Sequence, residues 1–192
     1  QAMAEPRMRV LPTEERFGGA APNFLRLLRD VDLHDFDAVS FADQDDLWPE
    51  DKLTVAWNQL CQRGVSGYSC NVEAFWPDGR RAIVDKAQPQ RRWDHLFEAA
   101  GPGCTYLLAQ PFALVLQRVV REQRELLGSL QYHDWLTYAA ARSLAGGWFI
   151  DPQPHMAYRQ HGNNQIGVNA GWASLSRRLR QVWSGHALSQ AT

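Results

Sequence analysis

Short apolar runs alternate with stretches of helical spacing along the first third of the chain. Residues 7–11 and 37–41 are of strand length, and the second run is typical of a buried strand. Residues 23–29 have helical spacing behind a Gly-Gly break and Pro22. A second helix is predicted over residues 50–63, with an apolar face formed by Leu53, Ala56, Trp57 and Leu60.

The rest of the chain continues this alternation. Residues 68–84 have a β pattern with a turn at Pro77-Asp78-Gly79. Helices are predicted over residues 111–127, 133–144 and about 173–184, and short strands over residues 148–151 and 155–159. Helices that alternate with short strands indicate an α/β fold with a largely parallel sheet. We expect a single domain over residues 1–192, with its core at about residues 7–167.

The composition is that of an ordinary globular protein. Of the 192 residues, 45% are hydrophobic and 21% are charged, and 20 basic against 21 acidic side chains give a net charge of −1. This near-zero balance argues against a nucleic-acid binder that works by bulk charge. No apolar run approaches the roughly 20 residues of a membrane-spanning helix, and the first residues show no signal-peptide pattern.

Cysteine and tryptophan usage adds two expectations. Cys61, Cys70 and Cys104 are odd in number and far apart, so neither a disulfide framework nor a thiolate zinc site is predicted. With no signal peptide visible, this favours a reducing, cytoplasmic setting. The eight tryptophans are many for this length. Such rings fill cores or line sugar-binding surfaces, and composition leaves both interpretations open.

The strongest chemical signal is an acidic cluster directly after the strand predicted at residues 37–41. Asp43, Asp45 and Asp46 lie within four positions, where open α/β sheets place their ligand crevices. Carboxylates this close repel one another unless a cation or another partner lies among them, and oxygen ligands suit Mg²⁺ or Mn²⁺. The alternative is an acidic approach to the helix that begins near Glu50, which the helix dipole favours.

Two further polar clusters follow, each with a simpler alternative. Asp134 lies in the first turn of a predicted helix, where the dipole keeps a carboxylate ionised and able to act as a general base; a plain helix cap is the alternative. Arg159 and His161 open a polar loop that could hold a phosphate or a metal, or could be a solvated loop rich in turn residues. The basic segment 172–183 could rest on an anionic membrane surface or pack as a solvated terminal helix.

The order of these clusters resembles one enzyme family. The sequence Phe-Ala-Asp-Gln-Asp-Asp-Leu-Trp at residues 41–48, followed by Lys52-Leu53, looks like the DxD-type segment of inverting family 2 glycosyltransferases with the GT-A fold. It is closest to their rhamnosyltransferase-like branch. His133-Asp134-Trp135 matches the position of the catalytic-base segment of that family. Several segments in the right order are far more specific than any one of them alone.

Three more segments extend the resemblance to about residues 7–167. Residues 158–161, with Asn164 and Gly167, match the late polar loop of the family. Residues 101–108 resemble its acceptor-side segment, and residues 18–28 resemble the segment before the DxD strand. Nothing matches the N-terminal strands that cradle the nucleotide base and ribose in the family. The resemblance therefore implies a GT-A-like, Rossmann-like domain that lacks its N-terminal nucleotide-binding segment.

The resemblance implies transfer of a sugar such as rhamnose, with inversion, from a nucleotide-diphosphate sugar to a glycan or lipid-linked acceptor. Asp134 would be the catalytic base. The donor would be bound by Asp43, Gln44, Asp45, Asp46 and Arg159. Mg²⁺ or Mn²⁺ would be bound by Asp45 and His161, with His161 and Arg159 also stabilising the departing diphosphate. The acceptor side would comprise Trp48, Gly103, His133 and Trp135.

Two other interpretations stay open. The chain could be a truncated, non-catalytic module that binds a glycan or a partner chain, since the nucleotide-binding segment is not found. A metal-dependent hydrolase is the weaker choice, because the six histidines show no converging ligand spacing. We expect a cytoplasmic protein with room for peripheral contact at the inner face of the membrane. A sheet without its first strands would also favour self-association.

Overall fold

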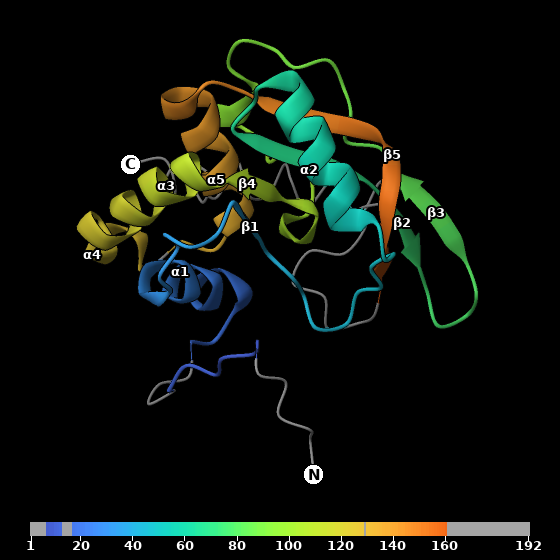
Figure 1. The fold of residues 1–192 in the computed structure, drawn as a ribbon. Helices are drawn as coiled ribbons and strands as arrows, with labels where there is room; N and C mark the ends of the chain where they lie inside the picture. The colour runs from blue at the N-terminus through green and yellow to red at the C-terminus, as the bar shows by residue number, and fades with distance from the viewer. Residues whose placement is uncertain (1–6, 13–16, 129, 161–192) are drawn as a thin grey trace, which may run out of the picture.

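A five-stranded sheet organises the computed structural model, which describes residues 7–12, 17–128 and 130–160 (Figure 1). Four strands follow one another in the order β1 (Ala38–Ser40), β4 (Leu107–Ala109), β2 (Gly67–Phe75) and β3 (Arg81–Val84). The fifth strand, β5 (Trp148–Arg159), pairs with β2 along most of its length. The loop that follows β1 reaches the end of β5, where Leu47 and Ala157 form an isolated antiparallel bridge.

The sheet is mixed, so the prediction of a largely parallel sheet is wrong. Among the described strands, β1 and β4, β4 and β2, and β2 and β3 pair antiparallel, and only β2 and β5 pair parallel. The β2–β3 connection is a tight turn closed by a hydrogen bond from Gly79 N to Trp76 O, and Gly79 takes a φ of 87°. Such a hairpin joins antiparallel strands, whereas parallel strands need a long crossover connection. The connection between the parallel strands β2 and β5 is of this long kind and contains the helices that precede β5.

Helices cover both faces of the sheet. On one face α2 (Lys52–Arg63) packs Ala56 and Leu60 against strand residues that include Leu107. On the other face lie α1 (Ala20–Asp30), α3 (Gln110–Glu122) and α5 (His133–Ala140), around the larger core that contains Leu108. Because neighbouring residues of a strand point to opposite faces, Leu107 and Leu108 serve different cores. The α/β class predicted from the sequence is confirmed.

Several predicted boundaries change because of local backbone chemistry. The helix expected over residues 111–127 is divided at Gln123 into α3 and the short α4 (Arg124–Leu127). The helix expected over residues 133–144 continues beyond α5 as a wider π turn, η3 (Ala141–Ala145), and ends at Gly146, whose φ is 93°. A left-handed residue of this kind is a usual way to end a helix.

Two strand predictions also need correction. Residues 7–11 form no strand, because the described part of the chain provides no strand beside them and their side chains are largely exposed. The strands expected at residues 148–151 and 155–159 are one strand, β5, whose register against β2 shifts around Asn71. The Asn71 side chain donates a hydrogen bond to Pro152 O (2.9 Å) at this irregularity. No helix in the described ranges has the length and apolarity that a membrane crossing requires.

Candidate functional site

The acidic loop, residues 42–49 between β1 and α2, is fastened to the end of β5. Leu47 and Ala157 exchange two backbone hydrogen bonds of 3.0 Å each. The backbone N–H of Arg159 donates to Asp46 Oδ1 at 3.0 Å. These bonds fix a segment that carries three carboxylates, and they join it to Arg159, which the family resemblance assigns to donor binding together with this segment.

The acidic loop meets a second segment, the 3₁₀ turn η2 (Gly103–Thr105) that precedes β4. One potential ligand atom from each of Asp43, Asp46 and Cys104 lies within 4.8 Å of the other two. Asp46 Oδ2 is buried and accepts no hydrogen bond from the protein. The two carboxylates, one of which has this unpartnered oxygen, are hard oxygen ligands of the kind that fit a divalent cation such as Mg²⁺, whereas the thiol is a soft group. Asp45 is not part of this group.

Burial and charge repulsion shift the acid–base behaviour of this group. Burial, followed by the carboxylates of Asp46 and Asp45, raises the pKa of Asp43 to about 6. Burial also raises the pKa of Asp46, although hydrogen bonds from the Cys104 thiol and the Arg159 N–H act in the opposite direction. Burial and the two carboxylates raise the pKa of Cys104 well above the ordinary thiol range. The site therefore concentrates negative charge that a bound cation would stabilise.

Close contact between η2 and α5 depends on a glycine. A Cβ atom on Gly103 would lie 2.5 Å from His133 Nε2 and 3.4 Å from Asp134 Cβ. The His133 ring is held by Phe24, with ring centroids 4.5 Å apart, and by the edge-on ring of Phe41 at 5.3 Å. Burial lowers the pKa of His133 to about 4, so this imidazole is neutral at pH 7.

The first turn of α5 carries Asp134, whose charge acts on Asp43 of the acidic loop. Asp134 Oδ1 accepts a hydrogen bond from the backbone N–H of Trp135 at 2.8 Å. The Trp135 indole donates to His95 O at 2.9 Å and anchors the turn to η1 (Asp94–Leu96). Burial raises the pKa of Asp134, and the charge of Asp134 contributes to the raised pKa of Asp43. The structure thus brings the predicted base and the predicted donor-binding acids together.

The other predicted site residues among the described ones lie in or beside the acidic loop. Gln44 is exposed on the acidic loop. Trp48 is half-buried and packs against a small core that includes Cys104 and Met156. The Nε atom of Arg159 donates to the carbonyl of Asp45 at 2.8 Å, which holds its guanidinium beside the loop. The metal ligand predicted at His161 and the helix predicted at about residues 173–184 lie outside the described residues.

Sequence reasoning missed Cys104 as a site residue because it considered the cysteines only as pairs. The signal that could have found it is its place inside residues 101–108, the segment that resembles the acceptor side of the family. Cys104 directly follows Gly103, so the close packing of Gly103 also fixes the position of Cys104. Cys104 is 2% exposed and lies beneath the acidic loop.

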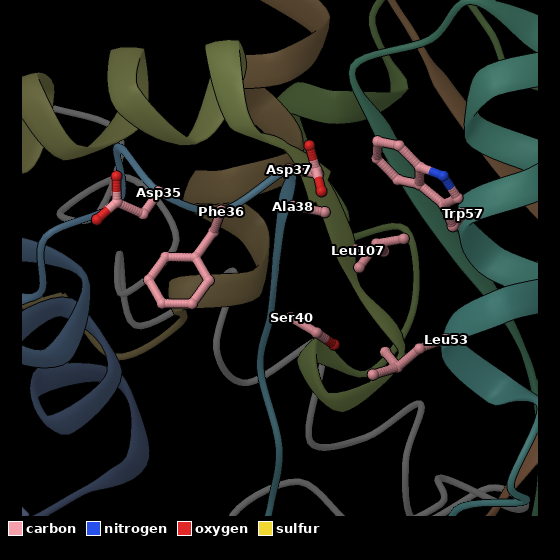
Figure 2. A pocket seen from close by; sticks show the side chains of 8 residues that line it. All are labelled: Asp35, Phe36, Asp37, Ala38, Ser40, Leu53, Trp57 and Leu107. Atoms are coloured by element: carbon pink, nitrogen blue, oxygen red, sulfur yellow. The ribbon is translucent and has the colours of Figure 1, made fainter. Parts of the chain in front are cut away.

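A pocket of about 380 Å³ lies between β1, β4 and α2 (Figure 2). Figure 2 shows Leu53 and Trp57 reaching from α2 towards β1. The lining consists of residues 35–38, Ser40, Leu53, Trp57 and Leu107. None of the residues predicted from the sequence to bind or react belongs to this lining, so the pocket is distinct from the acidic group.

Comparison with known proteins agrees with the resemblance seen in the sequence. No family model matches the chain. The chain is 42% identical over 173 residues to dTDP-rhamnosyl transferase RfbG of Shigella flexneri. The match covers 90% of this chain and 60% of that protein, so the chain spans about three-fifths of the length of its relative. Over nine-tenths of its length, this chain is similar to a rhamnosyltransferase.

Proposed function

We propose that this chain carries the reaction centre of a glycosyltransferase that moves a sugar such as rhamnose from a nucleotide-diphosphate sugar to a glycan or lipid-linked acceptor. The observation that carries the proposal is the grouping of Asp43 and Asp46 with η2, which packs against the first turn of α5, so that the charge of Asp134 acts on Asp43. The 42% identity to a dTDP-rhamnosyl transferase supports the choice of sugar and of donor class.

Asp134 is the proposed base. Its Oδ1 is held by the Trp135 N–H, which orients the carboxylate on the first turn of α5. Burial raises the pKa of Asp134, and a carboxylate of raised pKa takes a proton more readily. In this proposal Asp134 removes the proton of the acceptor hydroxyl while the oxygen attacks the anomeric carbon. The attack comes from the face opposite the departing diphosphate, so the configuration inverts.

The acidic loop and Arg159 are the proposed donor side. Mg²⁺ or Mn²⁺ bound here would neutralise the negative charge that develops on the leaving diphosphate. Asp43 and Asp46 are the carboxylates whose oxygens already lie within reach of one ion. Gln44, Asp45 and Arg159 are proposed to contact the donor, and Arg159 is positioned for this by its bond to the carbonyl of Asp45.

The acceptor side is proposed to lie around the first turn of α5. Gly103, His133 and Trp135 surround Asp134 there, and Trp48 borders the same group from the acidic loop. Trp48 and Trp135 are half-buried, and aromatic rings of this kind can line a sugar-binding surface. This assignment follows the family resemblance and the packing of η2 against α5.

Calorimetry with dTDP-rhamnose tests the donor proposal. In a chimera in which this chain replaces the matching part of RfbG, we expect binding that depends on Mg²⁺, is lost in Asp43→Asn and is retained in Asp78→Asn. Asp78 is an exposed carboxylate in the β2–β3 turn and serves as the matched control. Equal binding by the two variants would contradict a donor role for the acidic loop.

A further inference from the structure

Lys52, the first residue of α2, places a buried ammonium group beside the acidic cluster. The residue is 2% exposed, and its Nζ lies 3.5 Å from the centroid of the Trp48 ring. Among the described residues, no carboxylate or carbonyl forms an ion pair or hydrogen bond with this ammonium. Trp48 in turn packs against the small core that holds Cys104, the neighbour of Asp43 and Asp46. The carboxylate whose charge acts on the Lys52 ammonium is that of Asp46.

This position is unfavourable for a lysine unless negative charge lies nearby. Removing an ammonium from water costs free energy, and the first turn of a helix carries the positive end of the dipole. Burial accordingly lowers the pKa of Lys52 to about 8. The contact with Trp48 offsets part of this cost, because a desolvated cation is attracted to the face of an indole ring. The carboxylate of Asp46 acts in the same direction, because its negative charge favours the ammonium form of Lys52.

The chain uses lysine sparingly, which makes the choice at this position informative. The sequence contains two lysines, Lys52 and Lys86, and all its other basic residues are arginines. A lysine ends in a compact point charge without the flat, multidentate geometry of a guanidinium. A compact charge can stabilise carboxylates at a distance without forming hydrogen bonds to their oxygens, which stay free to bind a cation.

We propose that Lys52 is the internal counter-ion of the acidic cluster. Its ammonium partly neutralises the negative charge of Asp43 and Asp46, and it thereby lowers the affinity of the site for a divalent cation. The proposal rests on the cation site of the proposed function. It assigns to Lys52 a positioning and electrostatic role, since its ammonium need not touch the substrate. A site weakened in this way would hold its cation firmly only when an anionic donor adds further negative charge.

Binding of Mn²⁺, measured from the free-ion signal in electron paramagnetic resonance, tests this role. Lys52→Met removes the charge and keeps a similar shape. We expect it to bind Mn²⁺ about tenfold more tightly than the unmodified chain, because an unscreened positive charge near a dication is strongly unfavourable. Lys52→Arg keeps the charge and should restore the weak affinity.

Lys86→Met is the matched control, because it also removes one lysine charge but acts on Asp134 rather than on Asp46. We expect its Mn²⁺ affinity to stay within about twofold of the unmodified chain, since the field of a charge falls with distance. If Lys52→Met binds Mn²⁺ no more tightly than the unmodified chain, the counter-ion role is wrong while the cation site stands. If no protein in the series binds Mn²⁺, the cation site and the counter-ion role both fail.

A second measurement uses the unmodified chain and does not depend on how a variant folds. Lysine labelled with ¹³C at Cε gives two signals, because the sequence has two lysines, and Lys86→Met identifies them. Saturation with Mg²⁺ should shift the Lys52 signal and leave the Lys86 signal nearly unchanged. A Lys52 signal that does not move at saturating Mg²⁺ would overturn the proposal.

Discussion

At the scale of single residues, Gly103 permits the contact on which the candidate site depends. In Gly103→Ala the new methyl group would meet His133 Nε2 at 2.5 Å, so either η2 or α5 has to move. We expect a loss of about 1–3 kcal/mol in the free energy of unfolding, the usual cost of overpacking. Urea unfolding measures it.

A double variant tests whether this clash is the cause. His133→Ala removes the ring that the new methyl group would meet. We therefore expect Gly103→Ala to cost less stability in the His133→Ala background than in the unmodified chain. Additive losses would show that His133 is not what excludes a side chain at position 103.

His133 also predicts a specific pH dependence. Its pKa is lowered to about 4 in the folded chain by burial, while an unfolded chain protonates at the ordinary value of 6.5. The unfolded state therefore binds a proton first as the pH falls, and stability is lost between about pH 6.5 and 4, by at most about 3 kcal/mol. The stability of His133→Gln should fall less than that of the unmodified chain between pH 7 and 4.5. Parallel losses in the two proteins would refute this.

How far the sequence predicts the site differs from residue to residue. Asp43, Asp46 and Asp134 are recognisable because a carboxylate next to a strand end or helix start has a clear chemical meaning. Cys104 and Lys52 are not, because their roles arise only when η2 and α2 pack beneath the acidic loop. No local spacing encodes such contacts between distant segments.

At the scale of elements, α3 completes the end of α1. The Gln117 side-chain amide is buried and donates to Leu28 O and Val31 O, each at 2.7 Å. The last carbonyls of a helix lack partners within the helix, so this amide satisfies two groups that would otherwise be buried unpaired. We expect Gln117→Met to lower the free energy of unfolding by about 1–3 kcal/mol. Gln123→Met, at the exposed end of α3, is the control and should change little.

Elements with strong local signals are the ones that the sequence predicts well. The apolar spacing gives α1 and α2, and the Pro-Asp-Gly turn gives the β2–β3 hairpin. Strand direction is not a local property, because β1 and β4 find their partners across long stretches of chain. A strand of three residues such as β4 also carries too little pattern to be told from the start of the helix that follows it.

At the scale of the whole molecule, the side of β1 opposite β4 has no partner strand among the described residues, and apolar side chains gather around it. Phe36, Leu53 and Trp57 are 56%, 45% and 38% exposed and line the pocket in Figure 2. Open strand edges and exposed apolar patches favour association. We expect the apparent mass in light scattering to rise with protein concentration.

A pair of phenylalanine variants locates the cause of this association. Phe36→Ser should reduce the association. Phe97→Ser should leave it unchanged, because Phe97 follows η1 and is absent from the pocket lining, although its side chain is 84% exposed. A chain that stays monomeric at every concentration and melts sharply at high temperature would contradict the idea that a sheet edge is left uncovered.

The decisive measurement concerns Asp134 and the reaction itself. It uses a chimera in which this chain replaces the matching three-fifths of RfbG, assayed for rhamnose transfer from dTDP-rhamnose to the acceptor that the unmodified chimera uses. Asp134→Asn keeps the oxygen that accepts the Trp135 N–H but cannot take a proton. We expect turnover per folded molecule to fall by about 10²–10⁴-fold, the usual contribution of a general base, with little change in melting temperature or donor binding. Turnover within a few-fold of the unmodified chimera would show that Asp134 is structural and that the base lies elsewhere.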